Sequence, residues 1–213
     1  MKVVNFSQDN TLLNQYIAEI RDVNIQGDSL RFRRNIERIG EIMAYEISRD
    51  FPYKKIEVQT PLAMARENVP AEQPVIATIL RAGLPLHRGF INYFDHAENA
   101  FVSAYRKYID ENNFDIHIEY IASPRLDGKI LILVDPMLAT GGSATAAITM
   151  LKNKGVKKIR FMCIVAAPQG IERMQKEHPD VDLYVGALDD HLNENGYIVP
   201  GLGDAGDRIF GTK

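Results

Sequence analysis

Apolar positions follow two different periods along the chain. Near the N-terminus they recur at spacings of three and four, at Phe32, Ile36, Ile39, Met43 and Ile47. This is the period of a helix with one buried face. Phe51-Pro52 comes next, and a proline cannot continue a helix. The first fifty residues are therefore predicted to be helical.

From residue 75 onward, short apolar runs alternate with helical patterns. The runs at 75–80, 130–134 and 159–166 are typical of buried parallel strands. The stretches between and after them, at 84–94, 144–154 and 170–178, have the composition of helices. Alternation of this kind predicts an α/β fold with a doubly wound, mainly parallel sheet. No repeat or linker interrupts the chain, so residues 1–213 are predicted to form a single domain.

Residues 101–121 do not follow that alternation. Polar and apolar side chains alternate over 115–120, as in a half-exposed strand, and the turn-forming cluster 110–113 precedes them. Another strand candidate, 101–108, comes before the turn. The pattern predicts an antiparallel hairpin that projects from the main sheet. A lid, a dimerisation arm and a plain edge hairpin all fit it.

An acidic and glycine-rich segment follows the apolar run at 130–134. Ligands of α/β sheets bind beyond the carboxyl ends of strands, and the free N–H groups at a helix N-terminus bind phosphate. Gly141 and Gly142 would let the backbone approach a phosphate, and the Asp135 carboxylate could accept hydrogen bonds from ribose hydroxyls. An ordinary strand-to-helix connection, in which Asp135 only forms a turn, remains the alternative. Ser143 is the expected N-cap of the next helix, which Gly155 would end.

Composition narrows the functional classes. A net charge of -3 and a pI near 6.0 give no broad basic surface, so a nucleic-acid partner is not expected. The single cysteine, Cys163, excludes an intrachain disulfide and is expected to be an inert core thiol. No apolar run has membrane-spanning length and the start does not resemble a signal peptide, so a cytoplasmic protein without membrane association is expected. The five histidines show no ligand spacing.

Residues 134–143 closely resemble the phosphoribosyl pyrophosphate (PRPP) motif of uracil phosphoribosyltransferases. Where most type I phosphoribosyltransferases have two adjacent acids, the uracil branch has Asp-Pro, as in Asp135-Pro136. Other segments resemble the same family in order, so the resemblance covers nearly the whole chain: 31–33, 79–84, 105–106, 165–168 and 196–213. It implies a type I phosphoribosyltransferase fold that converts uracil and PRPP into UMP and diphosphate. The hairpin and the carboxyl-terminal base-binding loop, 196–213, would be parts of that fold.

The resemblance also implies which residues form the site. The PRPP contacts would come from Arg81, Arg106, Asp135, Pro136, Met137, Leu138, Ala139, Thr140, Gly141, Gly142, Ser143 and Asp204. Among these, Asp135, Asp204 and Arg106 would be the catalytic residues, with Arg106 arriving as a lid closes. Uracil would be held by Ile198, Gly203, Asp204 and Ala205, mostly through main-chain groups. Fixed backbone donors and acceptors match one edge of uracil and would leave a mismatch against cytosine.

The family chemistry implies one cofactor and several partners. Mg²⁺ would be held mainly through PRPP, without a protein metal site. Displacement at the ribose anomeric carbon needs positioning, charge stabilisation and exclusion of water more than side-chain acid–base chemistry. The family implies a homodimer or larger homo-oligomer, and GTP is a candidate activator because only some members respond to it.

Two competing functions are weighed against this one. A phosphoribosyltransferase-fold regulator that binds RNA would need a clustered basic face, for which no Lys/Arg run provides evidence. An enzyme for another base would share 131–143 but not the terminal segment. The formal Gly201-x-Gly203-x-x-Gly206 dinucleotide pattern is rejected, since Pro200 precedes it and no strand leads in. Lys107-Tyr108-Ile109 departs from the family's usual acidic continuation, so details of lid closure are not carried over.

Overall fold

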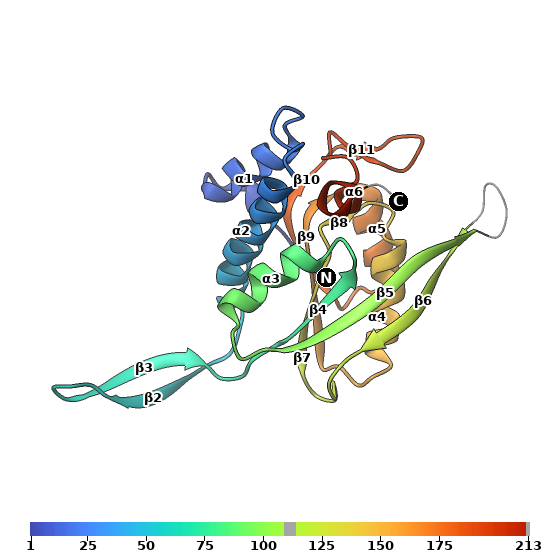
Figure 1. The fold of residues 1–213 in the computed structure, drawn as a ribbon. Helices are drawn as coiled ribbons and strands as arrows, with labels where there is room; N and C mark the ends of the chain where they lie inside the picture. The colour runs from blue at the N-terminus through green and yellow to red at the C-terminus, as the bar shows by residue number, and fades with distance from the viewer. Residues whose placement is uncertain (109–113, 212–213) are drawn as a thin grey trace.

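The computed structural model describes residues 1–108 and 114–211 and has a mainly parallel sheet between two groups of helices (Figure 1). The strand order is β1 (Val3–Asn5), β10 (Asp182–Leu188), β9 (Lys158–Ala166), β7 (Ile130–Val134), β4 (Val75–Leu80), β5 (Glu98–Tyr108) and β6 (Phe114–Ala122), with β8 (Met137–Leu138) paired to β9. Every neighbouring pair is parallel except β5 and β6, which are antiparallel. The predicted α/β architecture is confirmed.

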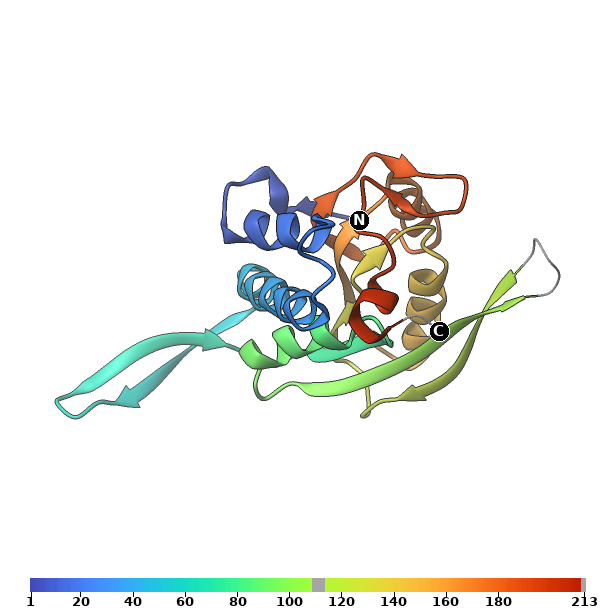
Figure 2. The ribbon, with the colours of Figure 1, turned by 45° about the horizontal axis from the view of Figure 1, so that its top comes forward.

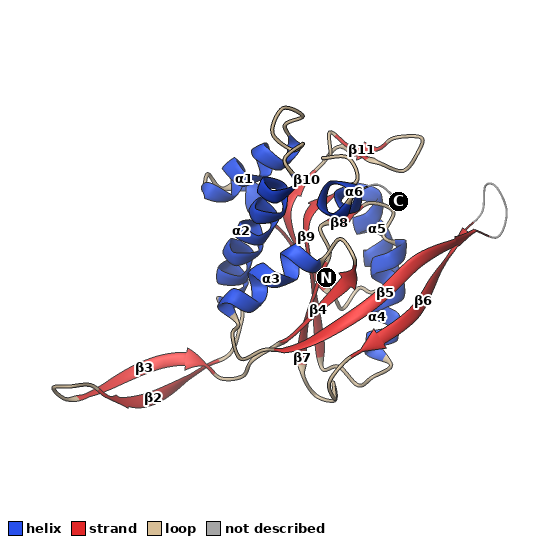
Figure 3. Cartoon of the chain, viewed as in Figure 1, coloured by secondary structure: helices blue, strands red, loops and turns tan. Residues whose placement is uncertain are grey.

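Both faces of the sheet are buried, which explains the nearly continuous apolar runs. In β7, Ile132 and Val134 pack into the core beneath α1 (Leu12–Arg21), α2 (Ser29–Ser48) and α3 (Leu84–Tyr93). Leu131 and Leu133 point to the opposite face, because side chains alternate along a strand, and pack under α4 (Gly142–Lys152) and α5 (Pro168–Glu177). The two helical layers are visible on either side of the sheet in Figures 2 and 3.

Most predicted elements are confirmed, with two corrections near their ends. The strands at 75–80 and 130–134 have the predicted bounds. The first fifty residues are not wholly helical: β1 pairs with β10, so tertiary pairing decides a segment too short to show a period. The Ser143 N-cap is wrong, because α4 begins at Gly142 after Gly141, whose φ of +79° is left-handed. Ser143 lies inside the first turn.

Two hairpins project from the body in different directions (Figure 1). The predicted one is confirmed as β5 and β6, and its 109–113 segment lies outside the described residues. The other, formed by β2 (Tyr53–Gln59) and β3 (Met64–Pro70), was not predicted and forms a separate two-stranded sheet. Nearly all of its side chains are at least partly exposed, so no buried face produced a clear apolar pattern.

The parallel strands place their carboxyl ends along one edge of the sheet. Arg81 follows β4, Asp135 follows β7 and Asp189 follows β10 at that edge. The terminal segment returns to the same edge through β11 (His191–Leu192), β12 (Ile198–Val199) and α6 (Ala205–Phe210). Open α/β sheets bind ligands at this edge. Within the described ranges, none of the helices combines the length and apolar character needed to cross a bilayer.

Candidate active site

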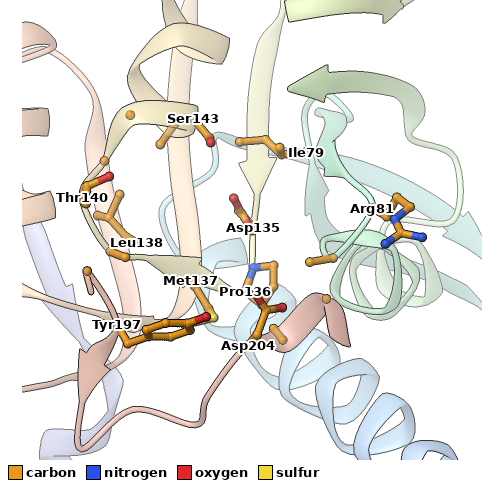
Figure 4. A pocket seen from close by; sticks show the side chains of 18 of the residues that line it. Ile79, Arg81, Asp135, Pro136, Met137, Leu138, Thr140, Ser143, Tyr197 and Asp204 are labelled. Atoms are coloured by element: carbon orange, nitrogen blue, oxygen red, sulfur yellow. The ribbon is translucent and has the colours of Figure 1, made fainter. Parts of the chain in front are cut away.

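A cavity of about 710 Å³ opens at the carboxyl edge of the sheet, between segments that are far apart in the sequence (Figure 4). Its walls come from residues 79–82 at the end of β4, 135–144 after β7, 195–197, and 203–207 at the start of α6. We call residues 135–143 the phosphate loop and residues 196–211 the terminal loop. The two loops form opposite walls of one cavity.

The phosphate loop takes its shape from β9. The Asp135 N–H donates to the carbonyl of Met162 at 3.1 Å, and the carbonyl of Pro136 accepts from Ile164 and Val165 at 3.0 and 3.1 Å. The short strand β8 then pairs with the end of β9. The chain is thereby led across the strand ends and directly into α4.

The start of α4 can bind an anion through its backbone. Gly141 makes no side-chain cap, and a Cβ at this position would lie 3.2 Å from the carbonyl of Gly170. The first N–H groups of an α-helix lack intrahelical acceptors and lie at the positive end of the helix dipole. Gly142, Ser143 and Ala144 line the cavity at this point. A phosphate group fits the N–H groups of this first turn together with the absence of a side chain at Gly141 and Gly142.

Asp135 is the ionisable group at the foot of this wall. Burial raises the pKa of its carboxyl group to about 7, against the opposing effect of a hydrogen bond from the Met137 backbone. Its neighbour Cys163 is fully buried, and burial raises the pKa of that thiol, so the thiol stays protonated as expected for a core cysteine. Asp135 can therefore change charge near neutral pH, and its ionised form accepts hydrogen bonds from hydroxyl groups.

Arg81 enters the site from the end of β4. The chain turns sharply behind it at Gly83, where a Cβ would lie 2.1 Å from the Thr78 hydroxyl oxygen and 2.8 Å from the Ile79 carbonyl oxygen. The Arg81 guanidinium carbon lies 5.6 Å from the centroid of the Phe210 ring. This cation–π contact joins an exposed cation to the last helix of the terminal loop. An anion in the cavity would meet a positive charge here.

The terminal loop presents backbone groups and the carboxylates of Asp204 and Asp207. The Asp204 side chain caps α6 by accepting from the Asp207 N–H at 2.9 Å. Gly203, with φ of +83°, precedes it in a left-handed conformation that favours glycine. The ring of Tyr197 reaches the cavity from the same loop (Figure 4). Polar main-chain groups without bulky side chains can match a flat heterocycle edge to edge.

The structure brings most of the sequence-predicted residues together. Those that line the cavity are Arg81, Asp135, Pro136, Met137, Leu138, Ala139, Thr140, Gly141, Gly142, Ser143, Gly203, Asp204 and Ala205. Ile198 does not line it; its side chain is buried in the core and β12 pairs with β11 there. The side chains of 104–119 lie outside the described part of the structure, so the role of Arg106 stays a prediction. The same holds for residues 212–213 of the predicted base-binding loop.

Several lining residues were not singled out from the sequence. They are Ile79, Leu80, Ala82, Ala144, Asn195, Gly196, Tyr197, Gly206 and Asp207, of which those from 196 onward lie in the predicted base-binding loop. Tyr197 stands beside Gly196 in an otherwise glycine-rich segment, and an aromatic side chain in such a loop is a usable signal for a ligand wall. Asn195 carried no signal, because it reaches the cavity only through the tertiary fold. The carboxylates of Asp135 and Asp204 come from separate loops.

The side chains fit a Mg²⁺ ion that arrives with a polyphosphate. Among residues 1–108 and 114–211, no group of three or more His, Cys, Asp or Glu side chains is close enough to hold a metal ion. Asp135, Asp204 and Asp207 nevertheless give the cavity three carboxylates, and Mg²⁺ commonly binds through one or two carboxylates together with phosphate oxygens and water. The donor set therefore suits a metal that is shared with a substrate.

Similar proteins point to one family. The family model described as uracil phosphoribosyltransferase matches residues 7–212. Proteins named uracil phosphoribosyltransferase are 54% identical in Porphyromonas gingivalis, over all of both chains, and 47% identical in Lactiplantibacillus plantarum, over 96% of this chain and 97% of that protein. The solved AQ2163 protein of Aquifex aeolicus superimposes with a TM-score of 0.88 and 31% identity over 99% of both chains. The chain belongs to the uracil phosphoribosyltransferase family.

Proposed function

We propose that the chain transfers the phosphoribosyl group of PRPP to uracil, giving UMP and diphosphate. One observation carries the proposal: the phosphate loop and the terminal loop form opposite walls of a single cavity. An anionic sugar phosphate suits the first wall and a flat heterocycle suits the second. Membership of the family supplies the identity of the two substrates.

Each part of PRPP has a matching group in the cavity. The N–H groups at the start of α4 suit the 5-phosphate, and Asp135 suits the ribose hydroxyls. Arg81 suits the pyrophosphate, and Arg106 would add a second cation from β5. Asp204 would approach the PRPP side from the terminal loop. The backbone at Gly203 and Ala205, which line the cavity, would pair with uracil together with the backbone of Ile198, which lies outside the lining. These assignments give each end of the sugar phosphate a fixed position.

The reaction is a displacement at the anomeric carbon. A bond forms between N1 of uracil and C1 of the ribose as the bond from C1 to the pyrophosphate oxygen breaks. The bonding electrons leave with diphosphate, which can also accept the proton lost from N1. Positive charge develops on the ribose, and an ionised Asp135 lies where it can stabilise that charge through the hydroxyls. Mg²⁺ bound to the pyrophosphate oxygens would neutralise the leaving group.

Regulation and assembly belong to the proposal as well. We expect a homodimer or larger homo-oligomer, because the β2–β3 hairpin extends away from the body as an isolated two-stranded ribbon. Such ribbons are marginally stable alone in water, and this one exposes Leu62 by 96% and Met64 by 56%. A second copy would cover them. GTP is the candidate activator, and a cytoplasmic location is expected.

The test is to supply the purified protein with PRPP, Mg²⁺ and each of uracil, cytosine, hypoxanthine and orotate. We expect UMP from uracil and little product from the other bases. Mismatched buried hydrogen bonds cost about 1–3 kcal/mol, or roughly 5- to 150-fold in discrimination for each mismatch. Absence of UMP, or faster turnover of another base, would refute the proposal. Repeating the assay with added GTP tests activation, and light scattering tests assembly.

A further inference from the structure

A buried ion pair outside the cavity holds the terminal loop. Arg21, the last residue of α1, donates from Nη2 to Oδ1 of Asp189 at 2.6 Å and from Nη1 to Oδ2 at 2.8 Å. The Asp189 side chain is 4% exposed and that of Arg21 is 21% exposed. Two parallel hydrogen bonds between a guanidinium and a carboxylate fix orientation as well as distance.

Both partners of this pair also bind the backbone of Gly201. Oδ2 of Asp189 accepts from the Gly201 N–H at 2.9 Å, and Nη1 of Arg21 donates to the Gly201 carbonyl at 2.9 Å. Gly201 has φ of +61°, and a Cβ there would lie 2.0 Å from the carbonyl oxygen of Ile198. The N–H and the carbonyl of Gly201 are therefore both hydrogen-bonded, each to one partner of the ion pair.

The ion pair is itself held by the body of the protein. The Asp189 N–H donates to the carbonyl of Ala166 at the end of β9, at 2.8 Å. The buried Gln26 donates from Nε2 to the carbonyl of Arg21, also at 2.8 Å. The ion pair therefore links Gly201 to α1 and to the central sheet, and these fix the position of Gly201. Neither Arg21 nor Asp189 lines the cavity, whereas Gly203, two positions after Gly201, does.

We propose that Arg21 and Asp189 are positioning residues for base recognition. This inference rests on the proposed function, in which the terminal loop binds uracil. Recognition through main-chain groups has no rotatable side chain to correct a displacement, so the loop must be fixed before the base arrives. Apart from Asp204, the PRPP side is built on β4, β7 and the start of α4, whereas the hydrogen bonds of the ion pair go to Gly201 and to the end of β9. The pair should therefore govern uracil binding more than PRPP binding.

A general structural role would give a different result. Removing one partner of a buried ion pair leaves the other charge unpaired and destabilises the whole protein. Loss of stability alone would lower the amount of active enzyme and leave both Michaelis constants unchanged. A positioning role instead raises the KM for uracil selectively and weakens discrimination against cytosine.

The experiment compares Arg21→Lys, Arg21→Met and Asp189→Asn with the unaltered protein. We expect the KM for uracil to rise roughly 10- to 100-fold in Arg21→Met and Asp189→Asn, since small misplacements of binding groups have effects of this size. The KM for PRPP should change by less than about 3-fold. Arg21→Lys should recover part of the loss because it keeps the charge, although lysine cannot form the paired bonds.

Arg49→Met is the matched control. Arg49 also pairs with a carboxylate, that of Glu46 at 3.1 Å, but this pair is exposed and lies at the end of α2. Both Michaelis constants should be unchanged. The inference would be overturned if the KM for uracil were unchanged in all three variants of Arg21 and Asp189. It would also be overturned if the KM for uracil and the KM for PRPP rose equally.

Hydrogen exchange of the backbone over 196–205 gives a readout that needs no activity. We expect faster exchange there in Arg21→Lys than in the unaltered protein, with protection of β7 and β9 retained. If the unaltered protein forms no UMP, the proposed function fails. This measurement still shows whether the Arg21–Asp189 ion pair fixes the terminal loop. If the unaltered protein forms UMP and hydrogen exchange over 196–205 does not change in Arg21→Lys, only the positioning role of the ion pair is refuted. Arg21→Lys also serves if the two more severe variants do not fold.

Discussion

The two walls of the cavity are built in different ways. The phosphate loop is shaped by nearby backbone: β9 beside it and the helix that it enters. The terminal loop is shaped by side chains from distant parts of the sequence. Arg21 reaches Gly201 across 180 positions, and Arg33 donates to the carbonyl of Ile209 across 176 positions at 2.9 Å. One wall is held by the backbone of an adjacent strand, and the other is held by side chains from remote segments.

This difference matches the ligand group proposed for each wall. A phosphate needs only converging N–H groups and positive charge, which the end of a strand and the start of a helix supply together. A neutral base must be recognised by the placement of a few backbone donors and acceptors. Changes within the phosphate loop should therefore act on chemistry, and changes around the terminal loop should act on base affinity.

Asp135→Asn should have the largest effect. We expect kcat to fall by about 100-fold or more, because the neutral amide cannot stabilise positive charge that develops on the ribose. The fold should persist and gain stability at pH 8. Burial raises the pKa of Asp135 from its ordinary value of 3.8 to about 7, so stability falls as pH rises between these values. The penalty is complete at pH 8, where removal of the carboxylate relieves it. Steady-state UMP formation and urea unfolding measure the two effects.

Asp127→Asn is the control for that substitution. Asp127 is an exposed acid that pairs with Arg125 at 3.0 Å, outside the cavity lining. Its kcat should equal that of the unaltered protein. If Asp135→Asn instead kept the kcat of the unaltered protein, the Asp135 carboxylate would have no role in the reaction.

Gly201→Ala should have the next largest effect and act on the other wall. The new Cβ would lie 2.0 Å from the Ile198 carbonyl oxygen, and φ of +61° disfavours alanine. We expect a loss of about 1–3 kcal/mol of unfolding free energy and a roughly 10-fold or greater rise in the KM for uracil. The KM for PRPP should change little. Urea unfolding and initial rates with each substrate varied measure these quantities.

Gly128→Ala separates backbone strain from the close contact. Gly128 has φ of +70° but no heavy atom within 4 Å of its Cβ position. It should lose only about 1–2 kcal/mol, the cost of a left-handed alanine, without any change in KM. Equal stability losses in the two variants would show that the contact with Ile198 does not matter.

The two walls also differ in how much of each could be predicted from the sequence. The phosphate loop was predicted because a buried strand, an acid, two glycines and a helix are contiguous. The one error within it, Ser143 as the N-cap, arose because Gly141 ends the turn with a left-handed φ that no propensity rule for serine anticipates. Asp189, by contrast, stands in the Asp189-Asp190 pair without a motif, and only the fold places it beside Arg21.

The same reason explains the segments whose structure was not predicted. The β2–β3 hairpin has few buried side chains, and β1 has only three residues, so neither gives a clear apolar period. Helix α6 is six residues long and lies in a glycine-rich segment. The Ile198 side chain lies in the core and outside the cavity lining, and the predicted main-chain contact of this residue with uracil stays a prediction. Local pattern identifies elements with a buried face and says little about segments fixed by remote partners.

The pH dependence of activity should show a smaller effect that belongs to the phosphate wall. With the pKa of Asp135 near 7, its ionised fraction rises about tenfold from pH 6 to pH 8. If only the carboxylate is active, kcat/KM for PRPP should rise by the same factor and level off above pH 8. A flat profile between these limits would contradict the assignment. The residual activity of Asp135→Asn should show no such rise.

Phe210→Ala should have the smallest effect and involve the contact between the two walls. The ring of Phe210, in the terminal loop, lies 5.6 Å from the Arg81 guanidinium carbon. Exposed cation–π contacts contribute about 0.5–1 kcal/mol, so the KM for PRPP should rise roughly 2- to 5-fold as Arg81 becomes less fixed. Tyr45→Ala removes a similar exposed contact, 5.3 Å from Arg49 on α2, and should leave that KM unchanged. Equal effects of the two substitutions would mean that the terminal loop does not position Arg81, so that the two walls bind their ligands independently.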